Sequence, residues 1–137
     1  MAKDIIHDAV KNALIKDGWT ITADPFRIQY EEFDLSADLS AERSLAAEKG
    51  SRKIVVEIKS FVGRSFVREL QQAMGQYSMY LGFMKMLDLE HKLFMAVSTL
   101  AYKRYFGQRA VKALLQQSQI PLLVVNIEQD EIVKWIS

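Results

Sequence analysis

The stretch that decides the fold is KIVVEIKSFVG, residues 53–63, in which a short apolar run carries two charged side chains. Successive side chains of a strand point to opposite faces, so Glu57 and Lys59 are expected on one face and Val56 and Ile58 on the other. A carboxylate and an ammonium group on a well-buried strand are costly without partners or a ligand. Glu57 and Lys59 are therefore the first candidate functional residues.

The residues before this strand predict a helix followed by strands. Apolar residues at helical spacing indicate a helix at 4–17, extended chain is expected at 19–22, and strict alternation indicates a strand at 26–30. The segments 44–49 and 53–61 flank a turn-forming Lys-Gly-Ser sequence and predict a β-hairpin.

The residues after it predict alternating helices and strands. We expect Ser65 to cap the longest helix, LFMAVS and PLLVVNI to form buried strands, residues 101–118 to be helical with a break near Gly107, and EIVKWI to form an edge strand. The expected order is helix, three strands, helix, strand, helix, strand, and then the edge strand. This order predicts an α/β fold with a central mixed sheet flanked by helices on both faces.

Length and composition bound the class of protein. The chain has 137 residues, half of them apolar, which predicts a single domain over residues 1–137. It has no cysteine, so a metal ion would be held mainly by oxygen atoms. The first residues mix charges into an apolar pattern, and the longest apolar run, IPLLVVNI, is too short to cross a bilayer. We expect a cytoplasmic protein with no membrane association.

The charge is nearly balanced overall but unevenly distributed. The net charge is +1. Residues 31–48 contain six carboxylates and one basic residue, whereas residues 91–127 contain no carboxylate. The second segment contributes candidate DNA-binding cations at Lys103, Arg104, Arg109 and Lys112. An acidic and a basic pole suit a metal site beside a phosphate track, although solvated faces also produce such blocks.

Metal-assisted phosphodiester hydrolysis gives the charged residues of the central strand a use. Mg²⁺ takes one or two protein carboxylates together with waters and substrate phosphate. Glu57 and a second carboxylate could hold Mg²⁺ or Mn²⁺, and Lys59 could orient the attacking water and stabilise charge on phosphorus. Asp38 is the preferred second ligand because it precedes the predicted hairpin; the competitors are Asp34, Glu42 and Glu48. The alternative is a plain ion pair between Glu57 and Lys59 on an exposed strand.

The helix after the central strand adds two polar candidates. Gln76 and Tyr80 are four residues apart and are expected on one helical face, whereas Tyr77 continues the apolar stripe. Solvation of Gln76 and a core position for Tyr80 are the competing interpretations. His7 could approach the metal from the first helix but could equally be a surface residue. His91 has no identifiable partner in the sequence.

Together these residues resemble a known nuclease motif. Asp38, then Glu57 and Lys59, then Gln76, Tyr77 and Tyr80 are similar to the D, E-x-K and Q-h-x-x-Y elements of the RecB-like branch of PD-(D/E)XK nucleases. The resemblance implies a restriction-endonuclease-like fold. It also implies that Asp38 and Glu57 bind the metal, that Lys59 is catalytic, and that Gln76 and Tyr80 support the site or approach DNA. Ala37 stands where that motif usually has proline.

Longer stretches resemble one member family. HDAVKNALIKDGWTIT, DLSAERSLAAEKG, VEIKSFVG and GQYSMY are similar to the XisH family across nearly the whole chain. This resemblance implies a cyanobacterial controlling factor that acts with a recombinase and an XisI-family protein. The implied process is excision of a DNA element from a nitrogen-fixation gene during heterocyst development.

Three functional hypotheses follow. The first is a Mg²⁺-dependent endonuclease or nickase that acts on DNA through Asp38, Glu57 and Lys59. The second is a noncatalytic protein that keeps the nuclease scaffold and binds DNA or a partner. The third is a toxin-like or defence nuclease restrained by a neighbouring protein. The apolar edge strand EIVKWI also makes a homodimer or heteromeric complex plausible.

Overall fold

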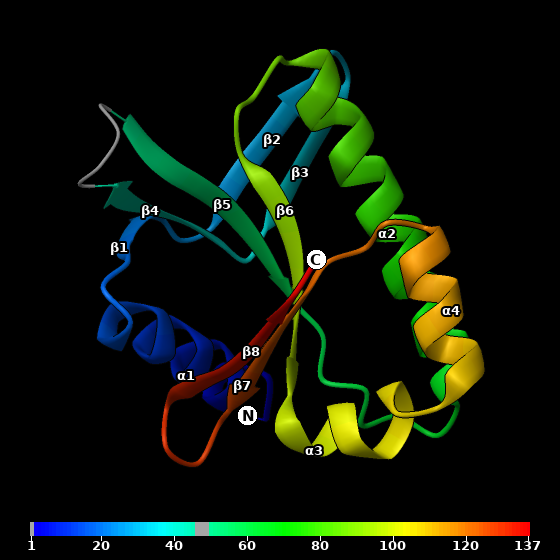
Figure 1. Ribbon diagram of the computed structural model, residues 1–137. Coiled ribbons are helices and arrows are strands. Elements are labelled where there is room, and N and C mark those ends of the chain that lie inside the picture. The colour runs from blue at the N-terminus through cyan, green and yellow to red at the C-terminus, as the bar shows by residue number, and fades with distance from the viewer. Residues whose placement is uncertain (1, 46–49) are drawn as a thin grey trace.

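The computed structural model describes the backbone of residues 2–45 and 50–137 and the side chains of residues 5–44 and 50–137. Figure 1 shows the fold from the N-terminus to the C-terminus. The elements, in chain order, are α1 (Ala2–Lys16), β1 (Thr20–Ala23), β2 (Phe26–Tyr30), β3 (Phe33–Ala37), β4 (Leu39–Leu45), β5 (Gly50–Ile58), α2 (Phe66–Met86), β6 (Lys92–Ser98), α3 (Thr99–Ala101), the π-helix η1 (Tyr102–Phe106), α4 (Arg109–Gln117), β7 (Leu122–Asn126) and β8 (Glu131–Ile136).

The central sheet is mixed. Its six strands lie in the order β1-β4-β5-β6-β7-β8. β5, β6 and β7 are parallel neighbours, whereas the pairs at the two sides, β1–β4, β4–β5 and β7–β8, are antiparallel. β2 and β3 form a separate two-stranded sheet. The α/β class and the central mixed sheet flanked by helices are thus confirmed.

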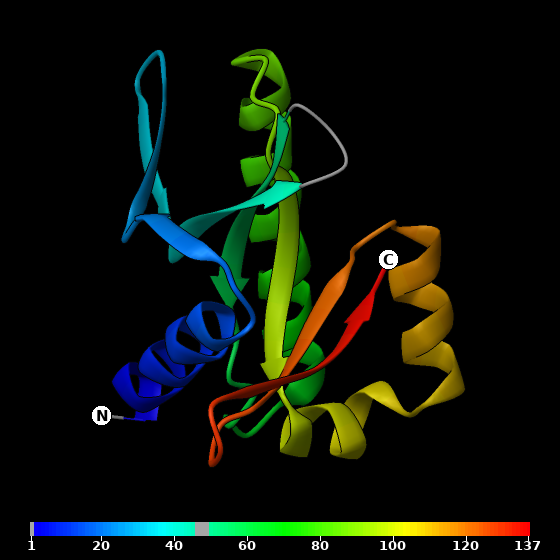
Figure 2. The same ribbon diagram turned by 60° about the vertical axis from the view of Figure 1, so that its left-hand side comes forward.

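Alternating side chains on the central strands divide the core into two layers. Val55 and Met95 pack on the face covered by α2 and α4, and Val56 and Phe94 pack on the opposite face with α1 (Figures 1 and 2). Complete burial of such a side chain contributes about 1.5–3 kcal/mol. Both faces of β5 are therefore buried, which makes a charged residue on this strand unusual.

The region between the first two long helices differs from the prediction. It contains five strands rather than three, because β1 and β3 also form. β3 was missed because only Ala37 of its residues is buried, so its sequence lacks a clear apolar alternation. The hairpin itself is present, but its first strand begins at Leu39 rather than at residue 44, because Leu39 and Ala41 are fully buried. Residues 46–49, the rest of that predicted strand, lie outside the described residues.

The other predicted elements are confirmed. The Ser65 side chain accepts a hydrogen bond from the Arg68 amide and caps α2, the longest helix. The helical region after β6 is interrupted between η1 and α4, next to Gly107, and β8 lies at an edge of the sheet. Among the described residues, no helix is long and apolar enough to span a membrane.

Candidate active site

Strand β5 places the charged pair where the alternation predicts. Glu57 lies on the same face as Val55, toward α2, and only 7% of its surface is exposed. Lys59 follows the strand end, and its amide still donates to the Ala96 carbonyl of β6. Its Nζ lies 3.6 Å from Glu57 Oε2. The two side chains are therefore neighbours at the carboxyl end of a central strand.

Asp38 joins this pair through the backbone. It occupies the bend between β3 and β4, and Leu39 after it pairs with Val56. The Asp38 amide donates to Glu57 Oε1 (3.1 Å), and the Ile58 amide donates to Asp38 Oδ2 (2.6 Å). This reciprocal pair of bonds sets the two carboxylates side by side.

The competing carboxylates are engaged elsewhere or lie outside the description. Asp34 accepts from the Arg27 guanidinium at 2.8 Å on the separate hairpin. Glu42 accepts a hydrogen bond from the Ser51 hydroxyl. Glu48 lies outside the described residues. Asp38 is the predicted second ligand that the structure brings to Glu57.

Burial and a neighbouring negative charge perturb Glu57. Burial, followed by the charge of Asp38, raises the pKa of Glu57 to about 8, and the nearby Lys59 ammonium opposes this shift. Glu57 thus shares the site with a second acidic group, Asp38, and with one cation, Lys59. This arrangement favours the binding of additional positive charge, because a cation would relieve the repulsion between the two carboxylates.

Helix α2 supports the site with a chain of hydrogen bonds. The Lys59 ammonium donates to Gln76 Oε1, Gln76 Nε2 donates to the Tyr80 hydroxyl at 2.7 Å, and that hydroxyl donates to the Ser36 carbonyl at 2.9 Å. The prediction that Gln76 and Tyr80 share a helical face is confirmed. Burial raises the pKa of Tyr80, so its hydroxyl keeps its proton. Gln76 therefore orients the Lys59 amine.

Tyr77 belongs to the core, as the apolar stripe predicts. Its ring is buried and its hydroxyl donates to the Leu93 carbonyl at 2.9 Å. Burial raises its pKa to about 12. Tyr77 thus anchors α2 to the sheet, whereas Tyr80 faces the charged residues.

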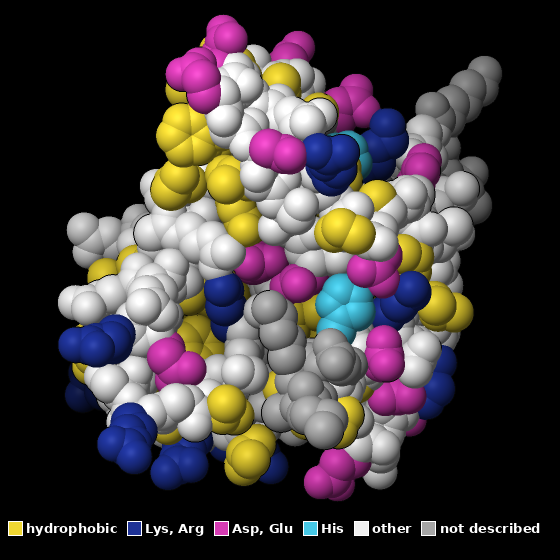
Figure 3. All heavy atoms as spheres, turned by 180° about the vertical axis from the view of Figure 1, so that it is seen from behind, with side chains coloured by type: hydrophobic (Ala, Val, Ile, Leu, Met, Phe, Trp, Pro, Cys, Tyr) yellow, Lys and Arg dark blue, Asp and Glu magenta, His cyan; other side chains and the backbone are white. Residues whose placement is uncertain are grey.

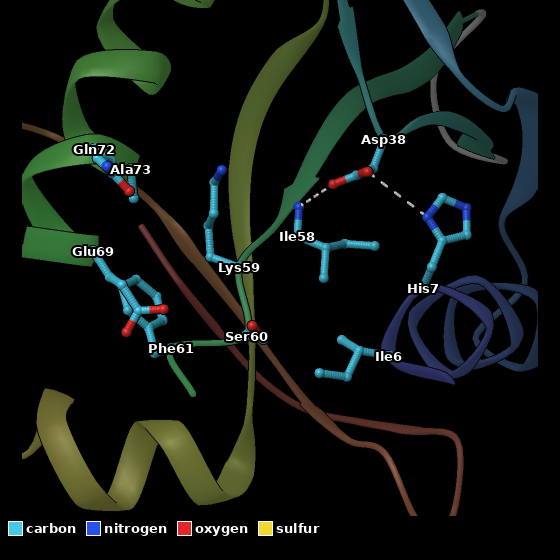
Figure 4. Close-up of a pocket in the computed structure, with 10 residues that line it drawn as sticks. All are labelled: Ile6, His7, Asp38, Ile58, Lys59, Ser60, Phe61, Glu69, Gln72 and Ala73. Atoms are coloured by element: carbon cyan, nitrogen blue, oxygen red, sulfur yellow. Dashed lines mark hydrogen bonds and ion pairs between the residues drawn. The ribbon is translucent and has the colours of Figure 1, made fainter. Parts of the chain in front are cut away.

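Helix α1 contributes a histidine to the site. His7 Nδ1 lies 3.8 Å from Asp38 Oδ1 (Figure 4). On the other side of the ring, His7 Nε2 lies 2.9 Å from Asp24 Oδ1. Asp24 also accepts from Lys11 at 2.9 Å. Burial opposes ionisation of Asp24, but its bonds to His7 and Lys11 outweigh that effect and lower its pKa. The sequence interpretation considered His7 but missed its partner Asp24, which is distant in the chain.

A cavity of about 240 Å³ is lined by His7, Asp38 and Lys59 of this site, whereas Glu57 lies behind its lining residues. Figure 4 shows Asp38 and His7 on one side, Lys59 in the middle, and Glu69 and Gln72 of α2 on the other side. The Glu69 carboxylate accepts from the Gly63 amide at 3.1 Å. Glu69 and Gln72 were not predicted. Gln72 lies one turn and Glu69 two turns before Gln76 on α2, and this helical spacing is the signal that could have found them.

The predicted site residues thus converge, and comparison with known proteins places the chain in a family. Residues 1–133 match the family model described as XisH protein. The chain belongs to the XisH family. A crystal structure of an XisH family protein from Nostoc punctiforme PCC 73102 has a TM-score of 0.87 and 37% identity, covering 98% of this chain and 100% of the other.

A second solved structure agrees with this XisH assignment. An fdxN element excision controlling factor protein from Anabaena variabilis gives a TM-score of 0.86 and 35% identity, covering 98% of this chain and 99% of that one. No curated protein matches the sequence. The fold is therefore shared with XisH-family structures over nearly the full length.

The donor set of this XisH-family chain fits a hard divalent cation. Among the described residues, no group of three or more His, Asp or Glu side chains could hold a metal ion. The carboxylates of Asp38 and Glu57 nevertheless lie side by side. Mg²⁺ commonly uses one or two carboxylates and completes its shell with waters and substrate phosphate. The two carboxylates are therefore sufficient protein ligands for this ion, while Zn²⁺ would require more.

The four predicted DNA-binding cations do not all lie together. Lys103 and Arg104 are on η1, near the start of α2, and Arg109 begins α4. Lys112 lines a second cleft of about 860 Å³ between α4 and β8. The two clefts share no lining residue. Only part of the predicted set can therefore belong to one surface with the candidate active site.

Proposed function

We propose that this XisH-family protein controls the excision of a DNA element and acts on DNA as a Mg²⁺-dependent endonuclease or nickase. Support for the controlling role comes from its similarity to the Anabaena variabilis excision controlling factor. Support for the chemistry comes from one observation above all: the Asp38 amide donates to Glu57 and the Ile58 amide donates to Asp38, so both carboxylates lie beside the Lys59 amine.

Each residue has a role in this proposal. Asp38 and Glu57 would hold the ion, which polarises the phosphate and lowers the pKa of its water when bound. Lys59, held by Gln76, stabilises negative charge that develops on the phosphate. Tyr80 fixes Gln76 by accepting its amide hydrogen. His7 stands behind Asp38 and, through Asp24, limits the positions that this carboxylate can adopt.

The proposed fold assignment is restriction-endonuclease-like. Its support is the strand order β4-β5-β6-β7, with α1 on one face and α2 on the other. The candidate residues lie at the bend before β4, at the end of β5 and on α2, the same chain order as the nuclease motif. The proposed partners are DNA and an XisI-family protein, and the edge position of β8 also allows a homodimer.

The test is cleavage of supercoiled, linear and branched DNA in Mg²⁺ or Mn²⁺. Asp38→Asn keeps an oxygen for the Ile58 amide but removes the charge, and Lys59→Ala removes the amine. We expect each to reduce cleavage by about 10²-fold or more. Asp34→Asn is the matched control, because Asp34 pairs with Arg27 away from the cavity. This variant should cleave DNA as the parent does.

Two results would change this proposal. Equal cleavage by the parent and Asp38→Asn would assign the activity to a contaminant or another site. Absence of cleavage under all conditions, including with an XisI-family partner, would favour the noncatalytic regulator. That alternative is consistent with the lack of a three-ligand metal cluster among the described residues.

A further inference from the structure

Four exposed cations from two distant segments lie at the same end of the molecule as the cavity. Arg64 precedes α2 and Arg68 lies in its first turn, while Lys103 and Arg104 lie on η1. Figures 1 and 2 both place the start of α2 beside the α3–η1 segment. We call these four residues the basic rim. Only its η1 half was expected from the sequence.

Aromatic packing fixes the two halves of the rim to each other and to the cavity. Phe66 stacks on Tyr105 with ring centroids 4.1 Å apart, and Phe61 contacts Phe106 at 5.3 Å. Phe61 also lines the cavity. The Arg104 guanidinium lies over the Tyr105 ring, 5.5 Å from its centroid. The rim is therefore attached to the wall of the candidate active site by buried or partly buried rings.

The charges of the rim are not explained by internal pairing. Within residues 5–44 and 50–137, no carboxylate forms an ion pair with any of the four cations. Arg68 also lies at the positive end of the α2 dipole, where a cation is electrostatically unfavourable. Stability alone therefore gives no reason for arginine at this position.

Exposed aliphatic side chains accompany the cations. Val62, Val67 and Leu100 are 73%, 64% and 72% exposed, and they belong to the same loop, helix start and α3 segment. Figure 3 shows Lys and Arg side chains gathered at the lower left, near hydrophobic ones. Cations mixed with exposed apolar groups are typical of a contact surface rather than a plain solvated face.

We propose that the basic rim binds the sugar–phosphate backbone of duplex DNA and holds it across the candidate active site. This inference rests on the proposed function and names the surface that its substrate uses. Arginine favours phosphate because its planar fork forms bidentate hydrogen bonds. Backbone contacts position DNA without reading its sequence. They also provide local attraction that the net charge of +1 does not supply.

The test measures binding separately from cleavage. Fluorescence anisotropy of a labelled 20-base-pair duplex is recorded in EDTA between 50 and 200 mM KCl. The variants are Arg64→Ala/Arg68→Ala and Lys103→Ala/Arg104→Ala. Each phosphate contact contributes about 0.9 to the slope of log K against log salt, so each double variant should lower it by about 2. We expect affinity at 100 mM KCl to fall about 30-fold or more.

The matched control is Arg52→Ala/Lys85→Ala, which removes the same charge. Lys85 lies 17 residues after Arg68 on α2, which is about 25 Å away at 1.5 Å per residue. Arg52 is exposed near the start of β5, seven residues before Lys59, which is about 23 Å away at about 3.3 Å per residue. The loss of two positive charges away from the rim should weaken DNA binding by the control by no more than about twofold relative to the parent. The melting temperature of Arg64→Ala/Arg68→Ala should not fall, because Arg68 does not stabilise α2.

The outcomes separate this inference from the proposed nuclease activity. The rim proposal would be overturned if the rim variants bound DNA with the affinity and salt slope of the parent. It would also be overturned if the control lost as much DNA affinity as the rim variants. The same would follow if the parent bound polyglutamate or anionic vesicles but not DNA. Normal rim-dependent DNA binding without any cleavage would keep the rim and remove the nuclease proposal.

Discussion

The substitution Glu57→Gln gives the sharpest prediction about the charged site. Glu57 has an ordinary pKa of 4.5, which the fold raises to about 8 through burial and the charge of Asp38. An acid with a raised pKa holds its proton in the folded state and releases it on unfolding. The contribution of Glu57 to the free energy of unfolding is therefore fully present below pH 4.5 and is lost as the pH rises toward 8. Glutamine cannot ionise and avoids this loss.

The expected magnitude follows from the shift. One pKa unit corresponds to about 1.4 kcal/mol, so the change sets a ceiling of about 5 kcal/mol at pH 8. Lys59 reduces this ceiling by favouring the charged form. A gain of even about 2 kcal/mol would raise the melting temperature by about 4–8 °C for a chain of this size. We expect a gain in this range at pH 8.5 and almost none at pH 5.

Thermal unfolding followed by circular dichroism between pH 5 and 8.5 measures the effect. Any constant repulsion between the new amide and Lys59 is removed by comparing pH values. Glu90→Gln is the control, because Glu90 is exposed and pairs only loosely with Lys53 at 3.4 Å. Mg²⁺ at pH 8 should stabilise the parent more than Glu57→Gln. A pH-independent difference between parent and variant would refute the assigned electrostatics of the site.

Three further predictions concern the scaffold. Ser65→Ala removes the side-chain acceptor of the Arg68 amide at the start of α2 and should lower the free energy of unfolding by about 1 kcal/mol in urea titrations. Tyr80→Phe leaves Gln76 Nε2 and the Ser36 carbonyl without their shared partner, so the free energy of unfolding should fall by about 1–3 kcal/mol. It would change little if the Tyr80 hydroxyl made no hydrogen bond. Leu123→Ala in the fully buried β7 should cost about 2–5 kcal/mol, whereas Leu114→Ala on the exposed side of α4 should stay within about 0.5 kcal/mol by the same assay.

The sequence predicted the parts of the site that follow from local periodicity. Alternation along β5 places Glu57 on one face, and helical spacing places Gln76 beside Tyr80. Asp38 required one further step, the pairing of the hairpin strands. Each of these steps uses neighbours within a strand, a helix turn or a single hairpin, and the structure brings all these residues together.

Residues that meet only through tertiary packing were harder to predict. His7 reaches Asp24 and Asp38 because α1 packs on one face of the central sheet, and no local pattern encodes that contact. The β3 strand was missed because its side chains are mostly exposed, which removes the alternation that identifies a strand. The arginine half of the basic rim was missed for a similar reason, since the stacking of Phe66 on Tyr105 joins segments far apart in sequence.

The two carboxylates and the Lys59 amine of the candidate site are held by different kinds of contact, and this difference determines which of them can move when a cation binds. The Asp38 and Glu57 carboxylates are fixed by main-chain amides, so their separation follows the pairing of β4 with β5. Lys59 is held by side chains alone, with Gln76 on one side and Glu57 on the other. A cation bound by the carboxylates would compete with Lys59 for Glu57 without moving the backbone. The amine could then turn toward a phosphate while the two carboxylates remain in place, which is the division of roles that the proposed chemistry requires.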